Sequence, residues 1–125
     1  MDANDFCTEQ IRQHLAAFGY DPLSASSTAP RDPVLGPLEV LLRIRASALA
    51  LIEERLRAQV HELECDAQHA RNALKHGRTP DITGAAVRVR ELSAAQHEAR
   101  TAFTETVRAV AAVLKHHPDY RSAAA

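Results

Sequence analysis

The sequence predicts an all-α protein, in which a long antiparallel helical hairpin of coiled-coil-like character follows a short N-terminal helix. One observation is a repeat of five leucines spaced seven residues apart, Leu35, Leu42, Leu49, Leu56 and Leu63. Another is a second apolar stripe from Ala85 to Val113, with alternating steps of four and three residues. Such heptad stripes lay one helix along another, and the turn-forming residues between them favour a hairpin.

Composition limits the class of protein. A chain of 125 residues with 46% hydrophobic and 25% charged residues is typical of one water-soluble domain. No apolar run approaches the ~20 residues of a membrane span, and the acidic start does not resemble a signal peptide. Cys7 and Cys65 provide no disulfide framework. We therefore expect a cytoplasmic protein that does not enter a membrane.

Residues 1–20 are predicted to form the short amphipathic helix. Asn4 or Asp5 can cap its start, and Gly19 can end it in the left-handed conformation. Its apolar stripe consists of Cys7, Ile11, Leu15 and Phe18. Residues 21–36 are rich in proline and serine and are expected to be a linker.

The hairpin is predicted to span residues 37–117. Pro37 suits the first turn of a helix over 37–76, and Gly77 suits its end. The turn is expected at 77–80, with Thr79 as the cap and Pro80 as the first residue of a helix over 81–117. Residues 118–125, which begin with proline, are expected to be a frayed tail.

A tight turn centred near residue 80 also predicts a register. The residue numbers of facing positions should sum to about 159 to 160, because the two arms run antiparallel. The predicted pairs are Leu74 with Ala85, Leu63 with Gln96, Leu56 with Phe103, and Leu49 with Val110.

Polar residues interrupt the leucine seam. Arg45, Gln59 and Asp66 occupy three of its six companion positions. Because an unpaired buried charge is costly, we expect the contact stripe to drift onto apolar neighbours, as in a bundle helix of period 3.6. These neighbours are Ala46, Val60, Ala67 and Leu74.

The beginning of the long second helix is apolar around most of its circumference, which favours burial on all sides. One hairpin partner and one short helix cannot cover so much surface, so we expect a homodimer or a helical protein partner. Pairing two hairpins into a four-helix bundle would supply the missing core. The residues expected at this interface are Leu38, Leu41, Ile44, Leu49, Leu51 and Ile52.

Basic residues are concentrated between residues 71 and 90, which carry a net charge of +4. A tight turn would gather them at the hairpin tip, where they could hold phosphate groups. Nucleic-acid binding is therefore the alternative function, although the tip has no aromatic residue on which a base could stack. The residues concerned are Arg71, Lys75, Arg78, Arg88 and Arg90.

Histidine and cysteine side chains suggest a third function. His61, Cys65 and His69 are spaced by four residues, and the predicted register brings His97 close to them. Imidazole and thiolate are good zinc ligands, so these four residues are the candidate metal site. Apart from zinc at this position, no cofactor is expected.

Motifs of catalysis are missing from the sequence. It contains no glycine-rich phosphate loop, no nucleophile elbow and no His-Glu-x-x-His. Neighbouring glutamates such as Glu53 and Glu54 diverge around a helix instead of converging. The sequence therefore favours a non-enzymatic protein–protein interaction module, a regulator, adaptor or assembly subunit that acts through its helical surfaces.

Overall fold

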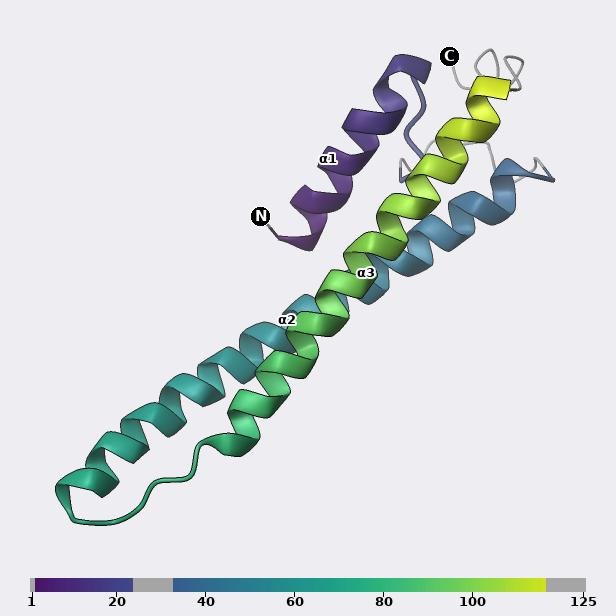
Figure 1. The fold of residues 1–125 in the computed structure, drawn as a ribbon. Coiled ribbons are helices and arrows are strands. Elements are labelled where there is room, and N and C mark those ends of the chain that lie inside the picture. Colours follow the sequence, from purple (N-terminus) through teal and green to yellow (C-terminus); the bar gives the residue numbers. More distant parts are fainter. Residues whose placement is uncertain (1, 24–32, 117–125) are drawn as a thin grey trace. The chain divides into compact units, whose positions relative to one another are not determined.

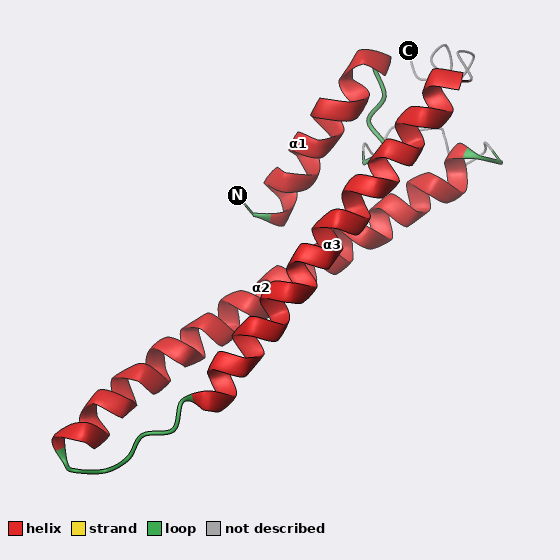
Figure 2. Ribbon diagram, in the orientation of Figure 1, coloured by secondary structure: helices red, strands yellow, loops and turns green. Residues whose placement is uncertain are grey.

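The computed structural model describes residues 2–23 and 33–116 and is all-helical over these ranges (Figures 1 and 2). The helices are α1 (Ala3–Leu15), followed by one 3-10 turn (Ala16–Phe18), α2 (Leu35–Lys75) and α3 (Thr83–His116). They comprise 86% of the described residues. This confirms the predicted helical hairpin with its short N-terminal helix. Residues 24–32 of the predicted linker, and the whole predicted tail over 118–125, lie outside the described residues.

The chain divides into two compact units, which we describe separately. The first unit combines residues 1–50 with 99–125, so it contains α1, the first part of α2 and the last part of α3. The second unit, residues 51–98, contains the rest of both long helices and their connection.

Helix α1 begins two or three residues earlier than we expected. The carboxylate of Asp2 accepts the backbone N–H of Asp5 at 2.8 Å and caps the helix, so neither Asn4 nor Asp5 has that role. The predicted end is confirmed, because Gly19 adopts the left-handed conformation with φ 63°. Three members of the predicted stripe, Cys7, Ile11 and Leu15, are buried.

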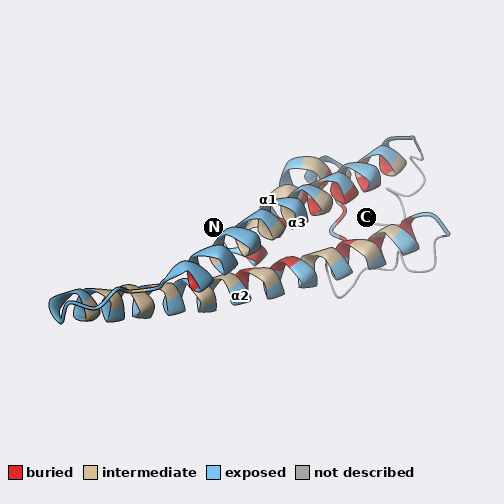
Figure 3. Ribbon diagram, turned by 60° about the horizontal axis from the view of Figure 1, so that its bottom comes forward, coloured by how far each residue is buried: buried red, intermediate tan, exposed pale blue. Residues whose placement is uncertain are grey.

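The first unit contains the hydrophobic core. Leu35, Leu42 and Leu49 from the heptad repeat pack in one cluster with the α1 stripe and with α3. The α3 members are Phe103, Val107, Val110 and Leu114. Figure 3 shows buried stretches on both α2 and α3. Three helices can enclose a core that two helices would leave open.

The second unit is thinner, and its heptad leucines are less buried. Leu56 and Leu63 are only half-buried. The buried residues of this unit, residues 51–98, are Glu53 and Ala85. Only two helices meet in this unit, so its seam leucines keep one side in water.

The seam drifts only partly in the predicted way, because Ala46 packs against the core and Ala67 is half-buried. Val60 and Leu74 are 38% and 64% exposed, so they do not replace the polar companion positions. Arg45, Gln59 and Asp66 stay half-buried at the seam. In the first unit, Arg45 donates to the carbonyl of Ala102 at 2.8 Å and to the hydroxyl of Thr106. These partners on α3 satisfy the Arg45 guanidinium. Its burial therefore does not carry the cost of an unpaired charge, which we had expected to move the seam away from it.

The end of α2 follows the prediction closely. Gly77 has φ 70°, and the N–H groups of Gly77 and Arg78 donate to the carbonyls of Leu74 and Ala73. This pair of bonds is a Schellman motif, in which glycine supplies the left-handed residue.

The start of α3 differs from the prediction. The helix begins at Thr83, and the carboxylate of Asp81 accepts the N–H of Thr83 at 3.0 Å. Thr79 and Pro80 therefore do not start the helix. They belong to a non-helical stretch, residues 78–82, which we call the return segment.

The predicted register is wrong by about ten residues. Side-chain contacts between α2 and α3 join residues whose numbers sum to between 147 and 151 in both units. In the second unit, Gln96 donates to Glu53 at 3.0 Å and so does not face Leu63.

The return segment explains this shift. An extended residue advances about 3.3 Å, whereas a helical residue advances 1.5 Å. At an extended rise, five non-helical residues would span the length of roughly eleven residues of α2 before α3 begins. In agreement, Ile82 lines the same hollow as Asp66, and Figure 1 shows this segment running beside α2.

Candidate functional site

The residues expected at a partner interface have different environments. In the first unit, Leu49 is completely buried in the core, and Leu38 and Leu41 are half-buried. Ile44 is 59% exposed. In the second unit, Leu51 is exposed and Ile52 is half-buried. Helix α1 packs on its own hairpin and covers part of the surface that we had expected a partner to cover.

An exposed apolar surface remains on α2 in the first unit. Val40 is 51% exposed and lies four residues before Ile44, so both project from the same side of the helix. Three further exposed residues with small or uncharged side chains share this side. We call this surface the outer face of α2; it consists of Pro37, Val40, Ile44, Ser47 and Ala48.

The sequence contains a signal for the outer face that we did not use. Positions 37, 40, 44 and 47 repeat the steps of three and four that mark a helical contact stripe. Val40 was not among the predicted interface residues.

Charge is sparse beside the outer face. In residues 35–50, Arg43 is the exposed charged residue, and its guanidinium bonds the carboxylate of Glu39 at 2.9 Å. Glu39 is itself buried and also accepts the hydroxyl of Tyr20 at 2.8 Å. The guanidinium reaches the carbonyl of Pro22 at 3.4 Å as well. This polar cluster holds residues 20–22 on α2, and sequence reasoning did not find it.

Side chains of α1 make specific contacts with α3. The ring of Phe6 lies 6.3 Å from the ring of Phe103, measured between centroids. The guanidinium of Arg100 lies 4.9 Å from the Phe6 centroid, within cation–π range. The hydroxyl of Thr104 donates to the amide oxygen of Gln10 at 3.2 Å.

The predicted basic tip is divided by the corrected register. In the second unit, Arg88 donates to Gln59 at 2.7 Å and lies 3.5 Å from the carboxylate of Glu62. Glu62 precedes Arg71 by roughly 13 Å along the helix. Arg88 and Arg90 therefore lie away from the hairpin end, where Arg71, Lys75 and Arg78 are exposed. Nucleic-acid binding stays a prediction, now with three clustered cations in place of five.

The candidate metal ligands do not converge as we expected. The sulfur of Cys65 lies 3.8 Å from the Nε2 atom of His61, and His69 is exposed one turn further on. The corrected register places His97 near residue 52, roughly 13 Å along α2 from His61. Among the described residues, no three such side chains are arranged to hold a metal ion. The zinc site suggested by the sequence therefore lacks its fourth ligand, His97 on α3.

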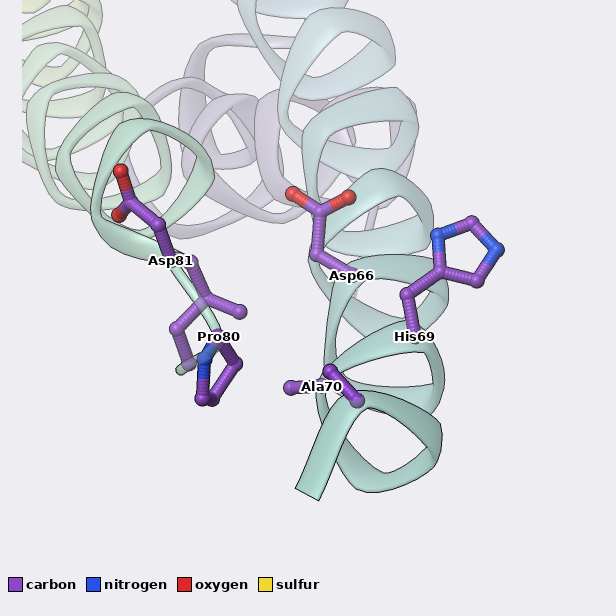
Figure 4. Close-up of a pocket in the computed structure, with 7 residues that line it drawn as sticks. Asp66, His69, Ala70, Pro80 and Asp81 are labelled. Atoms are coloured by element: carbon purple, nitrogen blue, oxygen red, sulfur yellow. The ribbon is translucent and has the colours of Figure 1, made fainter. Parts of the chain in front are cut away.

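An open hollow of about 260 Å³ lies between α2 and the return segment. Its lining includes Asp66, Ala70, Pro80 and Asp81 (Figure 4). The His69 ring points away from the return segment. The carboxylate of Asp81 is occupied by the N–H of Thr83, which lowers its pKa below the ordinary value. Nothing in this lining forms a recognisable catalytic arrangement.

The fold and the exposed outer face define this chain as an all-α helical hairpin with an unpaired helical surface. Comparison with protein-family models, curated proteins and solved structures finds no match for it. Within the described residues, no helix combines the length and the hydropathy that a membrane crossing requires.

Proposed function

We propose that the protein is a non-enzymatic protein–protein interaction module, a regulator, adaptor or assembly subunit, that binds through the outer face of α2. The observation that supports this is the exposure of Val40 and Ile44 on a helix whose other side is in the core. Burial of exposed apolar side chains favours association, and sparse charge lowers its desolvation cost.

The partner is a helix, and we propose that it belongs to a second copy of the chain. The three–four spacing of the outer face matches the geometry of helix pairing. A two-fold axis would place one outer face on the other, as in a four-helix bundle. Two large exposed side chains give less contact than a standard interface of about 800 Å² per partner, so we expect a weak, concentration-dependent dimer.

Sedimentation equilibrium over a wide concentration range tests this proposal. The wild-type chain should show increasing mass at high micromolar concentration, and Ile44→Glu should remain a monomer because a charge at the centre of the face resists burial. Val60→Glu is the matched control, since Val60 is an exposed apolar residue elsewhere on α2. A wild-type chain that remains monomeric throughout, or equal loss of dimer in both variants, would refute the proposal.

The proposal includes a cytoplasmic location. Both cysteines are free thiols, with Cys7 buried and Cys65 exposed. Free thiols agree with a reducing compartment. Fluorescence microscopy of the tagged chain in its own cells would test this part separately.

A further inference from the structure

Helix α1 packs on a surface of α3 within the first unit. We call this surface the α1-docking face and define it by Arg100, Phe103 and Thr104 on α3. These residues contact α1 through an arginine–ring contact, a ring–ring contact and one hydrogen bond. The surface therefore recognises both the apolar and the polar features of an amphipathic helix.

The docking of α1 uses side chains at helical spacing. Cys7, Ile11 and Leu15 are buried at steps of four, and Phe6 packs beside them. A helix of 13 residues is marginal in water on its own. Its helicity therefore depends on remaining docked, and a different amphipathic helix with the same spacing could make equivalent contacts.

A second contact fastens the chain just after α1. The hydroxyl of Tyr20 donates to the buried carboxylate of Glu39, and Arg43 joins Glu39 to the carbonyl of Pro22. We call these contacts the Tyr20 latch. The latch fixes residues 20–22 on α2 and so keeps α1 close to its docking face after any transient release.

We propose that the α1-docking face is an exchangeable binding site for an amphipathic helix of a partner protein, and that α1 is its built-in competitor. The ligand is a helix with an aromatic residue and three apolar residues in the pattern of Phe6, Cys7, Ile11 and Leu15, and with a polar acceptor for Thr104. Helix-in-groove recognition uses anchors of this spacing. This site is separate from the outer face of α2 and adds a second, regulated interaction.

Tethering explains why the competitor is effective. A short tether gives an effective concentration in the millimolar range. A free helix at ~10 µM then meets roughly a hundredfold disadvantage against tethered α1 of the same affinity. Binding of a partner in trans should therefore be weak until α1 is displaced.

The test measures binding of a fluorescent peptide with the sequence of residues 2–20 to the full chain. The wild-type chain should bind weakly. The Ile11→Glu chain should bind the peptide at least about tenfold more tightly, because the charge expels its own α1 and frees the face. Thr8→Glu is the matched control on the exposed side of α1, and it should bind like the wild type.

Two further measurements make the result decisive. A peptide that itself carries Ile11→Glu should not bind any chain, whereas Ile44→Glu in the chain should leave peptide binding unchanged. Circular dichroism checks that the hairpin remains helical. A folded Ile11→Glu chain that binds no better than the wild type would overturn the proposal.

If Ile11→Glu prevents folding, Tyr20→Phe provides the alternative variant. It removes the latch hydroxyl and keeps the ring, so α1 should return to its docking face less readily after release and peptide binding should tighten several-fold. Unchanged peptide binding by a folded Tyr20→Phe chain would also overturn the proposal.

Discussion

Asp81 illustrates how one side chain decides where a helix starts. Its carboxylate accepts the N–H of Thr83, an interaction that satisfies a backbone donor in the first turn of α3. The sequence Thr79-Pro80 looked like a better start, because threonine caps helices and proline suits the first position. Local propensity alone could not exclude Pro80 from the helix, since proline is equally compatible with an extended chain.

The bond to Thr83 predicts a pH dependence. The pKa of Asp81 is lowered in the folded chain, so its stabilising contribution is present in full above the pKa of the unfolded chain. It is lost as the pH falls through the lower folded-state pKa. NMR titration should show Asp81 titrating below ordinary aspartates. Asp81→Asn keeps the acceptor oxygen and should abolish this pH-dependent part of the stability. An ordinary Asp81 titration would contradict the capping role.

Pairing between elements is specified by polar residues at the seam. In the first unit Arg45 reaches Ala102 and Thr106, and in the second unit Glu53 pairs with Gln96. Apolar side chains slide along one another at little cost, whereas a displaced polar group loses its partner. Arg45, which interrupts the leucine seam, and Glu53 further along α2 therefore define the register of the arms.

A double-mutant cycle on Glu53 and Gln96 tests the register. Because the two side chains are bonded, we expect a coupling free energy of about 0.5–3 kcal/mol between Glu53→Ala and Gln96→Ala in chemical unfolding. Leu63→Ala with Gln96→Ala is the control cycle, and it should be additive. Coupling in the control cycle, together with additivity between Glu53 and Gln96, would instead support the register predicted from a tight turn.

Much of this element-level structure was predictable from the sequence. The heptad leucines, the glycines at the ends of α1 and α2, and the α1 stripe follow from spacing and backbone preference. The Asp2 cap, the register and the exposure of Val40 were not predicted. The cap is a local contact between Asp2 and Asp5, and the spacing of the outer face is present in the sequence, so both signals were available but not used. The register depends on how the return segment leads α3 back along α2, which the repeat within either helix does not specify.

The two units of the molecule differ in how deeply their apolar side chains are buried. Buried apolar residues form the core of the first unit, while the seam leucines of the second unit are half-buried. Local opening is easiest where little apolar surface must be exposed. The whole molecule should therefore not unfold uniformly.

Hydrogen exchange followed by mass spectrometry measures this difference. Amides of α2 around Leu63 should exchange faster than amides around Leu42, although both belong to the same helix. Phe103→Ala should cost about 3–5 kcal/mol because it leaves a cavity in the core, and it should accelerate exchange around Leu42 most strongly. Equal protection around Leu42 and Leu63 in the wild-type chain would contradict this expectation.

The return segment limits how the length of the chain can vary among homologues. Each extended residue that is added or deleted there moves the start of α3 by about 3.3 Å along α2, a distance that does not match the 5.4 Å helical pitch. A single-codon insertion or deletion in residues 78–82 would therefore misalign Gln96 and Glu53, while most replacements at the exposed positions of this segment would not. The length of this loop should consequently be inherited more strictly than its composition, the reverse of the usual behaviour of surface loops.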